Sequence, residues 1–411
     1  MAYRGPKMRS LVLVIGLLPL SPSRSRRAAP APRRYAMPTL RGCATKRVGA
    51  EVTTAEAKAD RSLSRAVAWL MSQQAKDGGW HSATYGSMRG GASITALVLY
   101  AMGRLPPQLV KPHRAKLEHG LAFLQRGISK KGFVTSPDGS LDYPAYATAM
   151  TLTACKRLGL PLEKSARMKL VAFLVREQLT EAKDFKPGRP DYGGWDLLAG
   201  SGARGVTSGS NVSVSAYVLE ALAADESAAA NAVRKRAGSW VRGCQNFPGD
   251  GGFFFHPQRS HLGNKALWTD KKGKHPRSYG TATCDGLLCL RFAGTPKSDK
   301  RFVAGVGWLK SHPAVKGVPG FEEAPKTLGW TEGLRFYYYC RLAPLLPFLA
   351  DRDAAGRRKA IIAVLTKDQR NDGRWKNESA RMREDDPLIA TCFAVIALGE
   401  IGRHRRQPPA R

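Results

Sequence analysis

Asp285 is the residue best placed by type and position to do chemistry, because it interrupts a segment that otherwise reads as an apolar helix. The segment is Ser278-Tyr279-Gly280-Thr281-Ala282-Thr283-Cys284-Asp285-Gly286. A carboxylate in such surroundings is costly to bury unless it is paired. Asp285 could bond to a neighbouring helix. It could also act as an acid, a base or a ligand toward a molecule that lies against Tyr279 and Cys284.

Glu332 is a second carboxylate with aromatic neighbours. It follows Trp330 and precedes three consecutive tyrosines, Tyr337 to Tyr339. Aromatic faces attract cations, so Glu332, Trp330 and Tyr337 could contribute to a site for a positively charged group. Packing of these rings in a core is the structural alternative.

Asp386 belongs to an acidic run, Glu384-Asp385-Asp386, which stands before the apolar stretch Leu388–Leu398. Asp is a good helix cap, and Pro387 suits the first helical position. Capping is therefore the structural interpretation of Asp386, and contact with a substrate is the functional one.

Neither the cysteines nor the histidines have the spacing of a metal site. The seven cysteines are odd in number, lack CxxC pairs and fall mostly on predicted helices, which favours buried free thiols. Six histidines lie mostly in predicted loops beside Lys, Arg or Pro, which is typical of surface residues: His113, His119, His256, His261, His275 and His312. We therefore expect no metal and no cofactor.

The elements that must position these groups repeat six times. In each unit an apolar helical stretch runs into a glycine-aromatic turn, and the turns are Gly78-Gly79-Trp80, Gly132-Phe133, Gly193-Gly194-Trp195, Gly251-Gly252-Phe253, Gly320-Phe321 and Gly373-Arg374-Trp375. Their spacing of roughly fifty to seventy residues leaves room for two helices in each unit.

Four units place a glutamine shortly before the turn: Gln74, Gln178, Gln245 and Gln369. The second and fifth units have Ile128 and Pro313 there instead. A glutamine near a helix end can satisfy backbone groups that the helix leaves unpaired, and a flat aromatic side chain can cover it. We therefore expect each turn, with Trp80, Trp195, Phe253 or Trp375, to tie its unit to the next.

A second apolar segment follows each turn and opens with small or hydroxyl residues, such as Ala92-Ser93-Ile94-Thr95, Tyr146-Ala147-Thr148, Ser213-Val214-Ser215 and Gly280-Thr281-Ala282-Thr283. We interpret these segments as inner helices that begin with weak caps and are buried on both sides. Strand signals are nearly absent. The pattern predicts an all-α fold, an (α/α)6 toroid of six outer and six inner helices over residues 56–402. Residues 1–55 would be a basic, disordered N-terminal segment and residues 403–411 a basic, disordered tail.

The first unit, with Arg65-Ala66, Trp69-Leu70, Gln74, Gly78 and Trp80, resembles the QW repeat of squalene and oxidosqualene cyclases and of protein prenyltransferase beta subunits. The resemblance covers roughly residues 60–400. It implies a toroid whose lumen holds a long isoprenoid, with catalytic groups projecting from the inner helices. On that basis Asp285 and Glu332 are candidate acids.

The catalytic motifs of those families are missing. The nearest approach to an Asp-x-Asp-Asp acid motif has Arg383 in the first place, before Glu384-Asp385-Asp386. Glu332-Gly333-Leu334 and Ala390-Thr391-Cys392 stand where the zinc ligands of a prenyltransferase would be. Three functions stay open: an isoprenoid cyclase- or transferase-like enzyme, a non-catalytic repeat-toroid binding or scaffold protein, and a carbohydrate-active (α/α)6 enzyme.

The chain is strongly basic, with 66 Lys and Arg against 32 Asp and Glu and a formal net charge of +34. Such charge favours diphosphates, anionic membrane surfaces or nucleic acid, although a basic solvated surface without a partner is the alternative. Nucleic acid is the least favoured, because the aromatics lie in turns and core faces. Two long segments, Glu181–Asn211 and Asp250–Ser278, would rim one mouth of the toroid. Their basic residues are Arg189, Arg204, Lys265, Lys271, Lys272 and Lys274.

The N-terminus combines basic residues with the apolar run Leu11–Leu20, the charge order and length of a secretory signal. Residues 1–31 would then direct export to the periplasm or beyond. The cleavage site is poor, and a true start at Met37 with a cytoplasmic protein is the competing interpretation. No apolar run reaches the roughly twenty residues of a membrane-spanning helix.

Overall fold

The computed structural model describes residues 54–406 except 141, 198, 201–204, 206, 224, 259–262, 268–274 and 323–328. The signal-peptide and start-codon hypotheses concern residues 1–53, which lie outside the described residues, as do Arg204, Lys271, Lys272 and Lys274. The expected basic tail begins at residue 403, but the last helix continues to Arg406.

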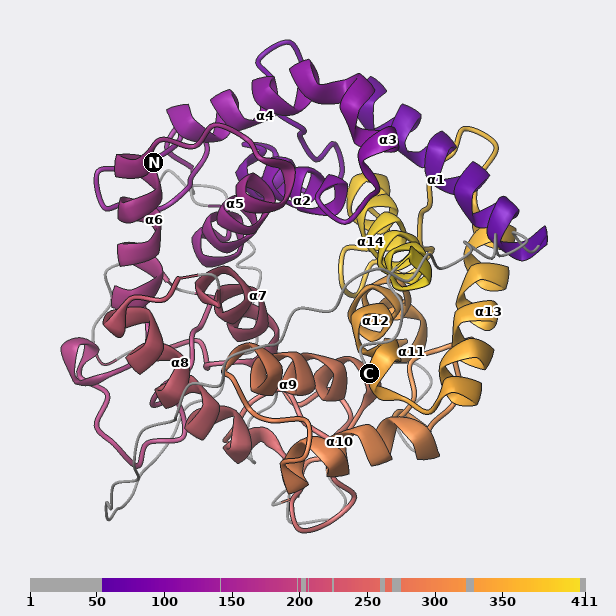
Figure 1. The fold of residues 1–411 in the computed structure, drawn as a ribbon. Coiled ribbons are helices and arrows are strands. Elements are labelled where there is room, and N and C mark those ends of the chain that lie inside the picture. The colour runs from indigo at the N-terminus through magenta and orange to yellow at the C-terminus, as the bar shows by residue number, and fades with distance from the viewer. Residues whose placement is uncertain are drawn as a thin grey trace, which may run out of the picture.

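Six inner helices form a closed ring (Figure 1). They are α2 (Ala92–Met102), α5 (Pro144–Leu158), α7 (Val212–Leu222), α9 (Gly280–Phe292), α12 (Arg335–Leu342) and α14 (Pro387–Arg406). Each packs against the next in chain order, and α14 packs against α2. The predicted all-α fold is confirmed.

Six further helices surround this ring (Figure 1). They are α1 (Thr54–Ser72), α4 (Arg114–Arg126), α6 (Lys164–Arg176), α8 (Ala228–Val241), α10 (Lys300–Ser311) and α13 (Asp351–Asp368). Helix α1 contacts α13, so the outer layer also meets itself where the chain begins and ends.

Short elements connect the long helices. They are α3 (Pro107–Val110), α11 (Trp330–Gly333) and the 3-10 turns η1 (Gly86–Met88), η2 (Lys111–His113), η3 (Glu181–Lys183), η4 (Arg242–Cys244) and η6 (Ala343–Phe348). The described residues include two isolated β-bridges and no strand.

The inner helices are buried because both of their faces are covered. All residues of α2 are buried, as are all of α7 except Ser213. Helix α14 contains the one described segment that is long and apolar enough to cross a membrane, Pro387–His404, and 78% of that segment is buried inside the ring. Its apolar character thus matches its position as a core helix.

The four glutamines tie neighbouring units together through their side-chain amides. Each donates to a glycine carbonyl of its own turn, at Gly78, Gly193, Gly251 or Gly373. Each also donates to a carbonyl of the next outer helix, at Lys116, Val233, Arg301 or Ser62. One side chain therefore fixes both a turn and the neighbouring unit.

The turn aromatics are held from two sides. The indole N–H groups of Trp80, Trp195 and Trp375 donate to the carbonyls of Leu70, Leu174 and Leu365 in the preceding outer helix. Backbone N–H groups of the turns donate to hydroxyls of the following inner helix, at Thr95, Thr148, Ser215, Thr283 and Thr391.

These hydroxyls do not cap the inner helices, so the expectation of weak caps is wrong for α2, α5 and α9. The N-cap residues there are Gly91, Tyr143 and Tyr279, and none makes a side-chain capping bond. Helix α7 has a true cap in Asn211, whose side chain accepts a hydrogen bond from Val214 N at 3.0 Å. The hydroxyls instead join each turn to its inner helix.

Candidate functional site

Asp285 lies in the middle of α9 and is paired with the neighbouring inner helix α12. Arg341 Nε donates to Asp285 Oδ1 at 2.5 Å, and the Tyr337 hydroxyl lies 2.9 Å from Oδ2. Both side chains of the ion pair are almost fully buried, at 3% exposed for Arg341 and 2% for Asp285. Burial raises the pKa of Asp285, and the Arg341 guanidinium opposes that rise.

Tyr337 connects this ion pair to two more inner helices. Its hydroxyl lies 2.6 Å from Ser213 Oγ of α7, and the Tyr146 hydroxyl of α5 donates to the same oxygen at 2.9 Å. Arg341 also packs over the ring of Tyr217, 4.5 Å from its centroid. A series of polar contacts thus links four inner helices, α5, α7, α12 and α9.

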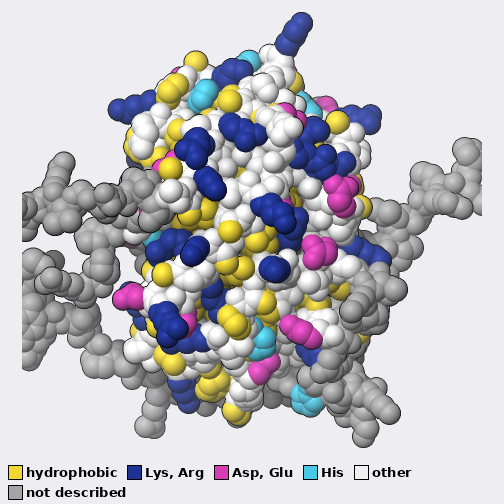
Figure 2. Space-filling model, turned by 90° about the vertical axis from the view of Figure 1, so that its right-hand side faces the viewer, with side chains coloured by type: hydrophobic (Ala, Val, Ile, Leu, Met, Phe, Trp, Pro, Cys, Tyr) yellow, Lys and Arg dark blue, Asp and Glu magenta, His cyan; other side chains and the backbone are white. Residues whose placement is uncertain are grey.

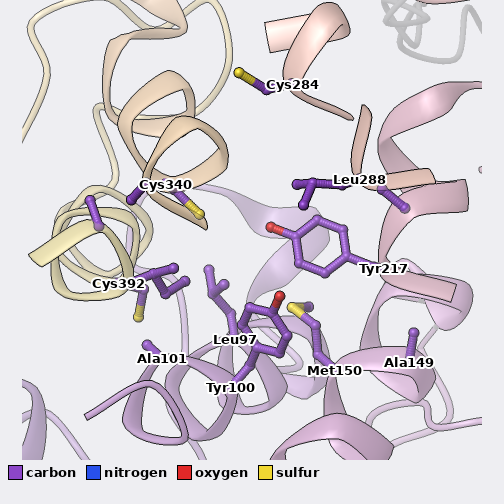
Figure 3. Close-up of a cluster of buried hydrophobic side chains, with 14 of the residues drawn as sticks. Leu97, Tyr100, Ala101, Ala149, Met150, Tyr217, Cys284, Leu288, Cys340 and Cys392 are labelled. Atoms are coloured by element: carbon purple, nitrogen blue, oxygen red, sulfur yellow. The ribbon is translucent and has the colours of Figure 1, made fainter. Parts of the chain in front are cut away.

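Aromatic, apolar and sulfur-containing side chains from all six inner helices form a buried cluster (Figure 3). Tyr100 of α2 and Tyr217 of α7 face each other with ring centroids 5.3 Å apart. Cys284, Cys340 and Cys392 are buried free thiols in the same cluster. Burial raises the pKa of the Cys284 thiol, which makes it a weak nucleophile.

A second buried charge network lies near the C-terminal ends of the inner helices. Arg104 donates to Glu220 Oε1 at 2.7 Å and to Glu400 Oε1 at 2.9 Å, and Arg157 donates to Glu220 Oε1 at 3.0 Å. The Tyr100 hydroxyl donates to Glu220 Oε2 at 2.6 Å. Burial alone would raise the pKa of Glu220, but Arg104 and Arg157 hold it at about 2. Both glutamates are therefore ionised and neutralised by arginines.

A pocket of about 640 Å³ opens beside this network, where α2, α5 and α7 end. Its wall combines basic side chains, Lys156, Arg157 and Arg403, with apolar ones, Leu105, Leu152 and Phe292. We call it the mouth pocket. A recess of about 100 Å³ shares several of these residues and reaches Tyr100, Leu288 and Cys340 of the central cluster.

The mouth pocket and its recess carry more positive than negative charge. Lys156 and Arg291 have no carboxylate partner among the described residues, and Arg403 lies 4.0 Å from Glu400. Arg291 instead packs over the rings of Phe292 and Phe348, 5.5 Å and 5.4 Å from their centroids. Lys156 in the mouth pocket and Arg291 in its recess are therefore available to an anionic group.

Comparison with known proteins gives a fold. No family model matches the chain, and no curated protein is similar in sequence. Solved structures of type II terpene cyclase MstE from Scytonema do match: the apo enzyme has a TM-score of 0.56 and 15% identity over 85% of this chain and 99% of that chain. The chain has the fold of type II terpene cyclases. A protein from Actinoplanes also shares this fold, with a TM-score of 0.55 and 16% identity over 84% of this chain and 99% of that one.

A variant of MstE in complex with geranylgeranyl dihydroxybenzoate, described as its substrate, has a TM-score of 0.57 and 16% identity to this chain. It covers 85% of this chain and 98% of its own. At such identities the likeness concerns the terpene cyclase fold alone, so the chemistry has to be argued from this chain's own residues.

Within the terpene cyclase fold the structure does not bring the two candidate acids together. Glu332 lies in the short helix α11 with 58% of its side chain exposed, and its nearest cation is Arg335 at 3.8 Å. Trp330 of the same helix is partly buried. Tyr279 is buried and packs on Phe321, with ring centroids 5.0 Å apart.

Asp386 occupies the capping position that its neighbour Pro387 suggested. Its Oδ1 accepts from Leu388 N at 2.8 Å, and its Oδ2 accepts from the Ser82 hydroxyl at 2.5 Å. Glu384 of the same acidic run accepts from the backbone N–H of Phe336 and Tyr337 at the start of α12. Burial raises the pKa of Glu384 to about 7.

Sequence reasoning missed the Arg104–Glu220–Glu400 network and the position of His256. His256 was interpreted as a surface residue, but it is buried and lies 3.2 Å from Asp191. Glu220 and Glu400 stand in the same kind of setting as Asp285, a carboxylate within an apolar helix, and that signal could have found them. Among the described residues, no three His, Cys, Asp or Glu side chains are grouped as metal ligands would be.

Proposed function

We propose that the protein binds an isoprenoid amphiphile with an anionic head group at the mouth pocket, without catalysing acid-initiated cyclisation. The observation that carries the proposal is the mixed wall of that pocket, about 640 Å³ in volume, with basic side chains next to apolar ones. An apolar site with a few convergent polar groups is the usual form of a small-molecule site.

Basic side chains outside the buried charge network favour a ligand with an anionic head group. Arg104 and Arg157 are engaged by Glu220 and Glu400. Lys156 and Arg291 have no carboxylate partner among the described residues, and Arg403 lies 4.0 Å from Glu400, which Arg104 already engages. Guanidinium groups bind phosphate or carboxylate oxygens strongly, because each can donate two parallel hydrogen bonds. A diphosphate or a carboxylate therefore matches this part of the pocket.

The apolar part of the pocket supports a hydrocarbon tail. Leu105, Leu152 and Phe292 line the pocket, and the recess reaches Leu288 and Tyr100. The geranylgeranyl group carried by the MstE substrate is an isoprenoid chain, and MstE has the same fold. An isoprenoid tail is therefore the hydrocarbon that agrees with both the apolar lining of the pocket and the structural similarity to MstE.

The position of Asp285 favours binding over cyclisation. An acid that starts a cyclisation must be protonated and must face the substrate. Asp285 is already engaged by Arg341 and Tyr337, and it does not line the mouth pocket. This arrangement supports a structural role for Asp285 and the non-catalytic function that the missing Asp-x-Asp-Asp motif suggested.

Calorimetric titration with three probes tests the proposal. Geranylgeranyl diphosphate carries tail and charge, geranylgeraniol carries the tail alone, and inorganic diphosphate carries the charge alone. We expect the first to bind at least ten-fold more tightly than either of the others. If geranylgeraniol bound as tightly as geranylgeranyl diphosphate, the pocket would not recognise an anionic head group. If inorganic diphosphate bound as tightly, the pocket would not recognise the tail.

Variants assign the binding to the mouth pocket, which Arg403 lines, and to its recess, which Arg291 and Arg403 line. Arg291→Gln combined with Arg403→Gln should weaken binding of geranylgeranyl diphosphate by about ten-fold or more, because charge-assisted hydrogen bonds are lost. Arg352→Gln is the matched control, since Arg352 is an exposed arginine on the outer helix α13. Mass spectrometry of the same mixtures decides the catalytic question: a cyclised or transferred product would contradict the non-catalytic part of the proposal.

A further inference from the structure

We propose that Lys265 is an amine nucleophile that forms a Schiff base with an apolar or aromatic aldehyde. Lys265 belongs to the long segment between η4 and α9, which follows the turn of the fourth unit. The backbone carbonyl of Phe255 in this segment accepts from Val212 N, the first residue of α7, at 3.1 Å. The mouth pocket lies at the other end of α7, so the two sites are separate.

The ammonium group of Lys265 lies against one aromatic ring and near a second. Its Nζ lies 3.7 Å from the ring centroid of Phe255 and 5.8 Å from that of Trp330. Within the described part of the chain, no residue pairs with this ammonium or accepts a hydrogen bond from it. An amine in such a setting loses hydration without gaining a counter-ion in contact.

The backbone around Lys265 is held in place. Asn264 is buried and its Oδ1 accepts from His256 N at 2.9 Å, while its Nδ2 donates to His256 O at 3.3 Å. Ala266 on the other side is also buried. The backbone on both sides of Lys265 is therefore anchored, whereas the Lys265 side chain remains partly exposed to solvent.

The surroundings favour the reactive, uncharged form of the amine. Burial lowers the pKa of Lys265 to about 8, and the charge of Asp285 in α9 opposes this shift. Asp285 is itself paired with Arg341 of α12, and Arg381 packs on the far ring, Trp330, at 5.9 Å. At pH 8 about half of such amines are unprotonated, against less than about 1% of ordinary lysines. Desolvated lysines of this kind are effective nucleophiles.

The reaction needs no oxidant, reductant or metal. The free amine attacks the carbonyl carbon, a C–N bond forms, and a proton moves from nitrogen to the carbonyl oxygen to give a carbinolamine. Loss of that hydroxyl together with the remaining N–H proton releases one water and leaves the imine. Phe255 and Trp330 would flank an apolar aldehyde beside the nitrogen.

Reductive trapping in the full chain tests the inference. The protein is incubated with a limiting amount of trans-cinnamaldehyde and cyanoborohydride at pH 8, and the modified lysines are mapped by peptide mass spectrometry. We expect Lys265 to be labelled at least ten-fold more than Lys300, the matched control. Lys300 also lies near a ring, 5.8 Å from the centroid of Phe247, but it is exposed. Labelling at equal levels would overturn the inference.

The pH dependence of labelling gives a second readout that needs no variant. The labelling rate of Lys265 should reach half its maximum near pH 8. A labelling rate of Lys265 that keeps rising well above pH 9 would overturn the inference. The inference about Lys265 does not depend on the proposed lipid site. The double variant Arg291→Gln with Arg403→Gln should therefore leave the labelling of Lys265 unchanged.

Discussion

The side-chain amide of Gln369 donates to the backbone carbonyl of Ser62, 307 positions earlier in the chain, at 2.9 Å. The same amide donates to the carbonyl of Gly373 in its own turn at 2.7 Å. Gln74, Gln178 and Gln245 make the same two bonds between consecutive units. The joint between the last unit and the first is therefore built like the three joints that Gln74, Gln178 and Gln245 make between consecutive units.

Gln369→Met should weaken the ring at this closing joint. The substitution keeps the length of the side chain but leaves the carbonyls of Ser62 and Gly373 without their donor, so we expect a loss of about 1 to 3 kcal/mol in the free energy of unfolding. Urea denaturation measures it. Gln73→Met is the control, because the Gln73 amide donates only to the neighbouring hydroxyl of Ser72 at the surface. A Gln369 variant as stable as the Gln73 variant would contradict the expectation.

Removing one partner of the Asp285–Arg341 pair should cost more than removing both. Asp285→Asn leaves the buried Arg341 guanidinium without its counter-charge, for an expected loss of about 3 kcal/mol or more in the free energy of unfolding. The double variant Asp285→Leu with Arg341→Met removes both charges and should be more stable than Asp285→Leu alone or Arg341→Met alone. Chemical denaturation of these three proteins measures the coupling between the two residues, and additive losses in the free energy of unfolding would refute it.

Glu384 should make the protein less stable as the pH rises from about 4.5 to about 7. Burial raises the pKa of Glu384 to about 7 in the folded protein from its ordinary value of 4.5, so the folded state binds a proton that the unfolded state has released. The folded state gives up its own proton near pH 7, and by then roughly 3 kcal/mol of this contribution is lost.

Unfolding at pH 4.5, 6 and 7.5 tests the effect against Glu384→Gln, which cannot titrate. The other ionisable groups are present in both proteins, so the difference in their pH dependence isolates Glu384. Its carboxylate accepts from Phe336 N at 3.0 Å, Tyr337 N at 2.7 Å and Asn377 Nδ2 at 2.8 Å. Identical pH profiles for the two proteins would show that these donors cancel the effect of burial.

Two glycines in helices should respond to alanine with opposite signs. A β-carbon at Gly286 of α9 would lie 2.2 Å from Cδ1 of Phe253, so Gly286→Ala must displace the ring that covers the fourth turn. We expect a loss of about 1 to 3 kcal/mol in stability. Gly307 of α10 has no atom within 4 Å of such a carbon, so Gly307→Ala should gain about 0.5 to 1 kcal/mol. Thermal melting of both variants decides the matter.

The joints of the ring could be predicted from the sequence because their parts are close together in the chain. Trp80 lies ten positions after Leu70, whose carbonyl it binds, and Gln74 lies four positions before Gly78. Such short spacings leave a repeating signature, with the glycine-aromatic turn in all six units, the glutamine in four and the tryptophan in three. The sequence also singled out the hydroxyl of Thr95 at the start of its helix. Its partner is the backbone N–H of Trp80 in the turn and not the end of its own helix.

The charge pairs inside the ring could not be predicted in the same way. Arg104 and Glu220 are 116 positions apart, and Asp285 and Arg341 are 56 apart. In a chain with 66 basic residues, nothing in the sequence selects the arginine that meets a given carboxylate. The excess of basic over acidic residues does not point to a particular site, because on the face seen in Figure 2 the basic side chains are scattered among uncharged and hydrophobic ones.

The contact between α1 and α13 leaves the protein without a terminal repeat. Open stacks of helical repeats lose structure from their ends inward, because a terminal unit has a neighbour on only one side. Here each unit is flanked on both sides, so unravelling has no preferred starting point and a break anywhere exposes two units at once. The molecule should accordingly lose its structure in a single concerted step.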